Sequence, residues 1–219
     1  CNLNPKKQHI CNQTISLHQK MTDKKNIVQQ LSQLDKVILD LGCGPLKKNA
    51  KWIGIDMLEC EGVDIVGDVY EIIKAFPDNS VDEIHAFHFF EHLPDVPALL
   101  IDLKRVLKKD GFIEIVVPHF SNAYFYSDYT HKSFFGLYSF SYMVKDKLLN
   151  RKVPNYNLDT GLQLKSVFLR FKSALFINRP IRVLWQLIFN AGTLMQEWYE
   201  DSWSRNFPCY EIQFILTKV

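Results

Sequence analysis

The sequence predicts an α/β fold with a doubly wound, mostly parallel sheet, and three observations lead to this prediction. Short apolar runs of strand length recur along the first half of the chain, most are followed by turn residues, and a helix-like stretch separates the last two runs. The runs are residues 37–41, 52–55, 64–66, 83–87 and 112–117. Strands that alternate with helices favour a parallel, doubly wound sheet.

The chain before the first strand has a different composition. Residues 1–23 are rich in Lys, Asn and Gln and lack a sustained apolar period, which predicts a loose arm, and a short helix is expected around 24–34. We therefore expect an N-terminal arm and short helix over residues 1–35. A single domain is expected over 36–219, because 219 residues suit one domain with extra segments better than two.

The helix-like stretch covers residues 95–109, with apolar residues on one face and Lys and Arg on the other. Gly111 follows it and predicts where the helix ends.

The second half of the chain departs from this regular alternation. Residues 119–143 are crowded with aromatic side chains, which suits neither an ordinary loop nor a regular amphipathic helix. Two further strands are expected at 164–171 and 210–217, with a largely helical segment, 180–203, between them.

Charge and cysteine content restrict the partners and the compartment. A formal net charge of +2 without a Lys/Arg cluster gives little to neutralise phosphates, so nucleic acid is not expected as a partner. The five cysteines form no C-x-x-C pair, which predicts neither a zinc site nor a disulfide framework. Because neither a signal-peptide pattern nor an uncharged apolar stretch of roughly 18 residues is present, we expect a cytoplasmic protein with reduced thiols.

The stretch KVILDLGCGPLKKNAKWIGID, residues 36–56, predicts a nucleoside site. In a parallel sheet, Gly42 and Gly44 would lie beside Asp56 at the carboxyl ends of two neighbouring strands, where a ligand can approach bare backbone and a carboxylate can accept from two ribose hydroxyls. The third glycine of a dinucleotide fingerprint is replaced by Lys47, and residues 45–51 leave little room for a phosphate-binding helix. NAD and FAD are therefore disfavoured, and a ligand without phosphates fits better.

Four motifs in register carry a resemblance to a known family: VILDLGCGP at 37–45, IGIDM at 53–57, GDV at 67–69 and PDNSVDEIHAFHFFEHLPD at 77–95. They resemble the successive motifs of class I S-adenosylmethionine-dependent methyltransferases, and in particular the small bacterial-type branch, methyltransferase type 11-like, often associated with surface polysaccharide biosynthesis. The resemblance implies a Rossmann-like, seven-stranded sheet with an antiparallel last strand and a helical insertion or lid. It also implies methyl transfer from S-adenosylmethionine, with S-adenosylhomocysteine as product, and acceptor-site insertions at about 119–160 and 172–208.

The resemblance assigns roles to residues around the cofactor. Asp40 and the backbone of Gly42 and Gly44 would hold the methionine end, and Asp56 the ribose. The rest of the set would contact adenine or line the floor near the sulfonium, and comprises Met57, Asp68, Val69 and the backbone of Phe87 and His88.

Three residues after the fifth predicted strand are candidates for catalysis on the acceptor. A hydroxyl acceptor must lose a proton, which a histidine does well near neutral pH, so His119 or His131 is the expected general base and Asp128 the orienting carboxylate. The alternative is that these residues hydrogen-bond the loop to itself. His88 and His92 have helical metal-ligand spacing, but without a third ligand at motif spacing no metal is predicted.

The acceptor expected from the family is a hydroxyl of a sugar, glycan or lipid-linked precursor. A small-metabolite N- or O-methyltransferase and a catalytically silent binding-only relative are the alternatives. The apolar stripe of 180–203 is expected to cover the acceptor site, with a dimer interface or membrane contact ranked after that, and the sequence leaves the oligomeric state open.

Overall fold

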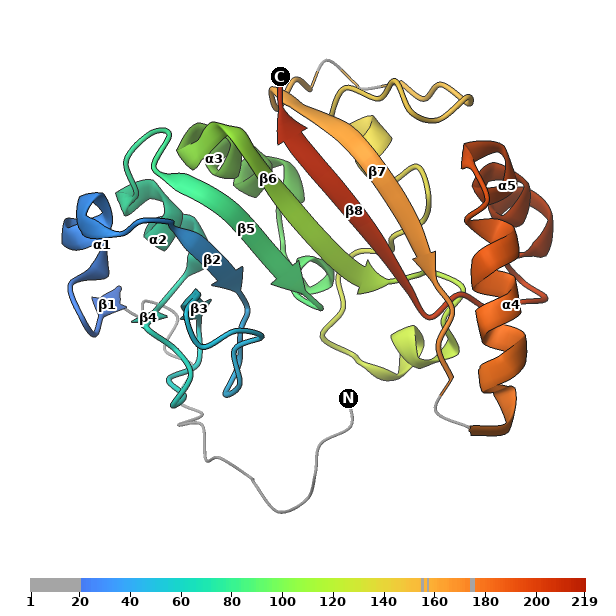
Figure 1. Cartoon of the computed structure of the whole chain (residues 1–219), viewed down its shortest axis with the longest axis horizontal. Helices are drawn as coiled ribbons and strands as arrows, with labels where there is room; N and C mark the ends of the chain where they lie inside the picture. Colours follow the sequence, from blue (N-terminus) through green and yellow to red (C-terminus); the bar gives the residue numbers. More distant parts are fainter. Residues whose placement is uncertain (1–20, 155, 157, 174–175) are drawn as a thin grey trace.

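The structure is a computed structural model, which describes residues 21–154, 156, 158–173 and 176–219. Its centre is one eight-stranded sheet in the order β1-β4-β3-β2-β5-β6-β8-β7 (Figure 1). The strands in chain order are β1 (Thr22–Asp23), β2 (Ile38–Leu41), β3 (Ile53–Asp56), β4 (Ile65–Val66), β5 (Val81–Phe87), β6 (Leu107–Pro118), β7 (Leu162–Arg170) and β8 (Glu211–Lys218).

The pairing confirms the predicted fold class. Strands β4, β3, β2, β5 and β6 run parallel, whereas the last strand, β8, lies antiparallel between β6 and β7. The two-residue strand β1 adds an eighth, antiparallel edge next to β4. Parallel pairing places the carboxyl ends of β2, β3 and β5 on one rim, which is where the candidate site is found.

The helices lie behind the sheet and at both of its edges (Figure 1). Helices α2 and α3 pack behind the parallel strands, and the helical segment after β7 lies beside that strand. Their bounds are α1 (Ile27–Gln30), α2 (Val69–Ala75), α3 (Val96–Val106), α4 (Arg179–Phe189) and α5 (Thr193–Trp198), with a π-helical turn, η6 (Tyr199–Trp203), after α5.

Two predictions about helix ends need correction. The helix expected over 24–34 is divided into α1 and a 3-10 turn, η1 (Leu31–Gln33). Helix α3 ends at Val106 because Leu107 already has extended backbone, so Gly111 lies inside β6 and does not stop the helix. Helix α2 was not expected at all, since its apolar stripe of Val69, Ile72 and Ile73 is very short.

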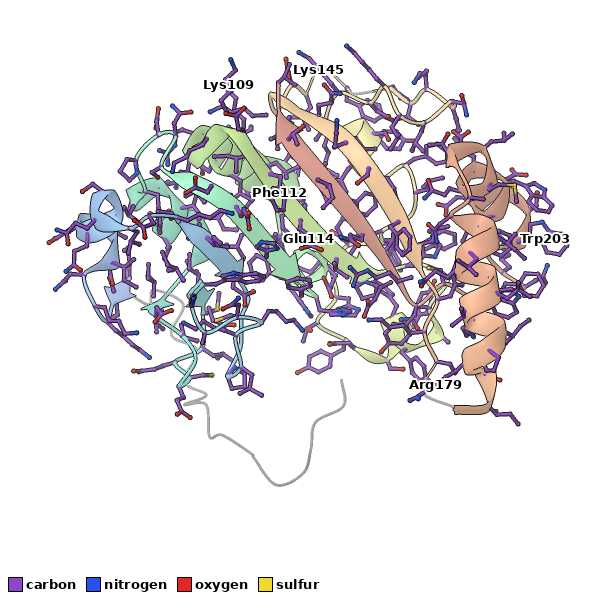
Figure 2. The ribbon with its side chains drawn as sticks, in the orientation of Figure 1. Lys109, Phe112, Glu114, Lys145, Arg179 and Trp203 are labelled. Atoms are coloured by element: carbon purple, nitrogen blue, oxygen red, sulfur yellow. The ribbon has the colours of Figure 1, made fainter. Side chains whose placement is uncertain are left out.

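The two faces of the sheet differ in burial. On the face toward α2 and α3, side chains such as Ile84, Ile113 and Phe214 are completely buried. The opposite face carries half-buried side chains, among them Phe112 and Glu114 of β6 (Figure 2). On this face His85 is hydrogen-bonded to Glu114 at 2.7 Å, so polar groups cover the sheet there.

The cysteines among the described residues differ in oxidation state. Cys43 and Cys209 are free, whereas Cys60 is disulfide-bonded, which corrects the expectation of reduced thiols throughout. The loose arm was predicted over residues 1–23, of which residues 1–20 lie outside the described residues. Within the described part of the chain, no helix is long and apolar enough to cross a membrane.

Candidate active site

The turn after β2 and the end of β3 meet as the sequence predicts. Gly42 and Gly44 both have left-handed backbone, with φ of 67° and 58°, which glycine adopts without steric cost. The Asp56 carboxylate accepts hydrogen bonds from the Gly44 amide at 2.8 Å and from the Leu58 amide at 2.9 Å. A carboxylate offers about four acceptor positions, so two remain for a ligand.

Residues of the short connection after Gly44 form hydrogen bonds within the protein. Lys47, in place of the third fingerprint glycine, reaches Asp64 at 2.6 Å. The Lys48 amide donates to Asp40 at 3.0 Å, and Asp40 is buried, which raises the pKa of its carboxyl group. Segment 45–51 contains no helix, in agreement with the argument against a dinucleotide.

A cavity of about 630 Å³, which we name the glycine cavity, opens beside this turn. Six of the nine predicted cofactor residues line it: Gly42, Asp56, Met57, Asp68, Val69 and His88. Asp40, Gly44 and Phe87 are not in its lining. Asp68 also caps α2, because its side chain accepts from the Tyr70 amide at 3.0 Å.

A second cavity, of about 740 Å³, adjoins the first and is named here the histidine cavity. Its lining comes from segments far apart in the sequence: His88, Glu91, His92, Pro118, Asn122, Tyr124, Phe125, Asp128, His131, Lys172, Ser173, Tyr210 and Glu211. His88 and His92 belong to the walls of both cavities. A molecule in one cavity would therefore lie next to a molecule in the other.

The two candidate bases have different positions. His119 is completely buried, with its ring nitrogens bonded to Ser121 at 2.8 Å and Glu200 at 2.9 Å, and it is not in the lining of the histidine cavity. His131 is in that lining. Its Nδ1 is hydrogen-bonded to the Phe125 carbonyl at 2.9 Å, and its Nε2 lies 3.6 Å from Asp128.

A sequence profile of the methyltransferase domain family matches residues 17–205. The chain belongs to this family. Among solved structures, the SAM-dependent methyltransferase from Archaeoglobus fulgidus is similar over 89% of this chain and 94% of its own, with a TM-score of 0.53 and 19% identity. At that identity the likeness establishes a shared fold.

Two further solved structures are similar to this chain. A Haloferax volcanii methyltransferase in complex with the Trm112 methyltransferase activator matches over 87% of both chains, with a TM-score of 0.49 and 12% identity. Haemonchus contortus phosphoethanolamine N-methyltransferase 2, in complex with phosphomonomethylethanolamine and S-adenosylhomocysteine, matches over 88% of this chain and 52% of its own. Its TM-score is 0.48 and its identity 15%. No curated protein sequence matches this chain.

His88 is the central residue between the two cavities of the methyltransferase. Its backbone is left-handed, with φ of 55°, and its amide donates to the Val116 carbonyl at 2.8 Å. Burial by itself lowers the pKa of His88, but the hydrogen bond to Glu211 at 3.0 Å and the nearby Glu91 carboxylate raise it to about 9. His88 is therefore a cation near neutral pH.

The partners of His88 were not predicted from the sequence. Burial alone would raise the pKa of Glu211, but hydrogen bonds from His88 and from Lys172 at 2.7 Å lower it to about 2. Glu211 is 123 residues from His88 in sequence, and no motif connects them. Only the antiparallel position of β8 beside β6 brings the Glu211 carboxylate to this rim.

Cys43, between the two turn glycines, has no nucleophilic character. Burial and the neighbouring Asp56 carboxylate raise the pKa of its thiol to about 12, so it stays protonated at neutral pH.

The aromatic-rich segment serves both as core and as surface. Phe125 and Phe135 are buried, whereas Tyr124, Tyr126 and Tyr129 are exposed. Of these, Tyr124 and Phe125 line the histidine cavity. The segment 180–203 contributes no residue to that lining, and part of its apolar stripe, including Leu184 and Leu194, is exposed.

Proposed function

We propose that the protein transfers a methyl group from S-adenosylmethionine to a hydroxyl of a sugar, glycan or lipid-linked precursor, leaving S-adenosylhomocysteine. The observation that carries the proposal is that two cavities meet at His88 and His92. Methyl transfer needs this arrangement, because the enzyme contributes mainly the alignment of donor and acceptor.

The residues of the glycine cavity fit S-adenosylmethionine. Gly44 is outside the lining of this cavity but belongs to the turn beside it, and a Cβ atom at Gly44 would meet nothing within 4 Å, so the turn backbone is open to a ligand there. Asp56 keeps acceptor positions for two ribose hydroxyls, and Met57, which is 47% exposed, offers an apolar surface for a purine. When bound, the cofactor supplies an activated methyl group on a sulfonium.

The histidine cavity fits a sugar better than an apolar acceptor. Tyr124, Phe125 and Tyr210 provide aromatic surface, while the exposed side chains of Asp128 and Lys172 provide hydrogen-bonding groups. A sugar ring presents both an apolar face and hydroxyls, so a mixed lining of this kind can bind it. A binding-only relative would be expected to fill this space with its own side chains, which a cavity of about 740 Å³ argues against.

The same lining supports the proposed domain organisation. Asn122, Tyr124, Phe125, Asp128 and His131 come from the insertion at 119–160, and Lys172 and Ser173 from the start of the insertion at 172–208. We propose a single domain over 36–219 whose insertions build the acceptor site.

His131 is the proposed group for activation of the acceptor hydroxyl. The Phe125 carbonyl can only accept, so the proton is on Nδ1 and the lone pair of His131 is on Nε2. Asp128 is held by Thr130, whose amide and hydroxyl donate to it at 2.9 and 2.6 Å. The buried His119 is a positioning residue for Ser121 and Glu200 in this proposal.

Formation of S-adenosylhomocysteine with a panel of nucleotide sugars and glycans tests the proposal. With an active acceptor, His131→Ala should lower turnover about 10²–10⁴-fold, the usual contribution of proton transfer. His119→Ala should lower the unfolding temperature, while folded protein retains most of its turnover. Failure of every acceptor, or unchanged turnover of His131→Ala, would contradict the proposal.

A further inference from the structure

Glu91, in the 3-10 turn η2 (Phe90–His92), is a buried carboxylate without a hydrogen bond. Its side chain is 1% exposed, and neither carboxylate oxygen has a hydrogen-bond partner among the described residues. The nearest basic nitrogens are His88 Nδ1 at 3.5 Å and His131 Nε2 at 4.0 Å. Burial of an unbonded carboxylate is costly, so a further positive partner is expected at this place.

His131 presents a lone pair to Glu91. Its Nδ1 proton is donated to the Phe125 carbonyl at 2.9 Å, which leaves Nε2 unprotonated in the neutral ring. Nε2 and Glu91 Oε1 then face each other across 4.0 Å, and both are acceptors. Two acceptors attract each other only through a proton or a metal cation between them.

His92 is held in the same tautomer by a different contact. The Thr130 hydroxyl donates its proton to Asp128 at 2.6 Å, so its oxygen accepts from His92 Nδ1 at 3.0 Å. The lone pair of His92 is therefore on Nε2. A hydrogen bond from the second ring nitrogen to an oxygen is the usual support of a metal-binding histidine, and both histidines have one.

We propose that Glu91, His92 and His131 bind a divalent transition-metal cation such as Zn²⁺ in the histidine cavity. One ligand atom from each residue lies within 4.8 Å of the others. Metal–ligand bonds of about 2.1 Å in a tetrahedral site separate the ligands by roughly 3.4 Å, so the three side chains close by about 1 Å on binding. Two imidazoles and one carboxylate are a donor set typical of zinc with one open position.

No metal was predicted from the sequence, because only His88 and His92 had ligand spacing. The structure brings the missing histidine, His131, from a loop 40 residues further along the chain, and uses Glu91 in place of His88. This long-range contact has no signature in the local sequence.

The position of the cluster suggests what the cation does. All three residues line the histidine cavity, and His92 also lines the glycine cavity. A hydroxyl bound at the open position would release its proton to solvent more readily, because the cation lowers its pKa. With the cation bound, the Nε2 lone pair of His131 is a ligand, so His131 would activate the hydroxyl through the cation and would not itself take the proton. The alkoxide would then form the new carbon–oxygen bond as the carbon–sulfur bond breaks. This role rests on the proposed methyl transfer, whereas cation binding does not.

Calorimetric titration of chelator-treated protein with Zn²⁺, and separately with Mg²⁺, tests the inference. We expect a Zn²⁺ site that depends on Glu91, His92 and His131, and much weaker binding there of Mg²⁺, which prefers oxygen ligands. Glu91→Gln and His131→Gln should each weaken this site on the order of 100-fold. Thr130→Val, which removes the hydroxyl that supports His92 and donates to Asp128, should weaken it about tenfold. His85→Gln is the matched control, because His85 is also a buried histidine between carboxylates, on the open sheet face.

The variants decide the outcome, because His9, Cys11 and His18 lie outside the described residues and could bind zinc independently. Zinc should raise the unfolding temperature of the wild type and of His85→Gln, and leave that of Glu91→Gln unchanged. Equal zinc binding by the wild type, Glu91→Gln and His131→Gln would overturn the inference, as would its absence from the wild type. Titration of the same variants with S-adenosylhomocysteine separates this result from a failure of the proposed function.

Discussion

The two turn glycines, Gly42 and Gly44, differ in the space that surrounds a Cβ atom, so alanine substitutions at the two positions form a matched pair. Both have left-handed backbone, so alanine at either position costs about 1–2 kcal/mol in conformational strain. A Cβ atom at Gly44 meets nothing within 4 Å. A Cβ atom at Gly42 lies 2.4 Å from Phe89 Cδ2 and 3.0 Å from Phe89 Cβ, so rotation of the ring cannot remove the overlap.

The added overlap at Gly42 should cost about 1–3 kcal/mol, the usual penalty for overpacking, beyond the strain that both variants share. For a domain of this size each kcal/mol lowers the unfolding temperature by about 2–4 °C, so Gly42→Ala should unfold about 2–12 °C below Gly44→Ala. Thermal unfolding followed by circular dichroism measures the difference. Because Phe89 lines the glycine cavity, Gly42→Ala should also weaken cofactor binding. Equal unfolding temperatures for the two variants would refute this account of the turn.

Two further predictions concern stability. Glu211→Gln should lower the free energy of unfolding by about 1–2 kcal/mol near pH 6, a modest value because the His88 side chain is 40% exposed. The pKa of His88 is raised from 6.5 to about 9 and that of Glu211 is lowered from 4.5 to about 2, so the pair stabilises the fold fully between about pH 4.5 and 6.5. The stabilisation decreases as the pH rises toward 9, where His88 loses its proton, and as the pH falls toward 2, where Glu211 gains one. Urea unfolding at several pH values measures this, and a pH-independent difference would contradict it. Asp95→Ala should cost about 1 kcal/mol, because the Asp95 side chain caps α3 by accepting from the Ala98 amide at 3.0 Å, whereas Asp95→Asn should unfold like the wild type.

The fold could be predicted from the sequence because the strands are short apolar runs bounded by turn residues. The runs at 37–41 and 83–87 correspond to β2 and β5, whose inner faces are buried. Helix α2 was missed because seven residues carry too few turns for a helical period. The end of α3 was misplaced because Gly111 is compatible with both a helix stop and a strand.

Some residues of the candidate site could likewise be predicted from the sequence, and others could not. Gly42 and Asp56 could be predicted, since parallel strands bring their carboxyl ends to one rim whatever the side chains do. Glu91, Glu211 and Lys172 could not, because their roles depend on contacts between distant segments. His119 and His131 are equivalent in the sequence, and only the packing of their loop buries one and leaves the other in the cavity.

The central claim is that the glycine cavity binds S-adenosylmethionine through Asp56. Calorimetric titration with S-adenosylmethionine and S-adenosylhomocysteine, with NAD as the negative control, tests it most directly. We expect binding of the first two in the micromolar range and no binding of NAD. Binding should be weakened at least roughly tenfold in Asp56→Ala, which loses the ribose acceptors, and less in Asp56→Asn, which keeps one oxygen. Absence of binding to the wild type, or equal affinity in Asp56→Ala, would contradict the claim.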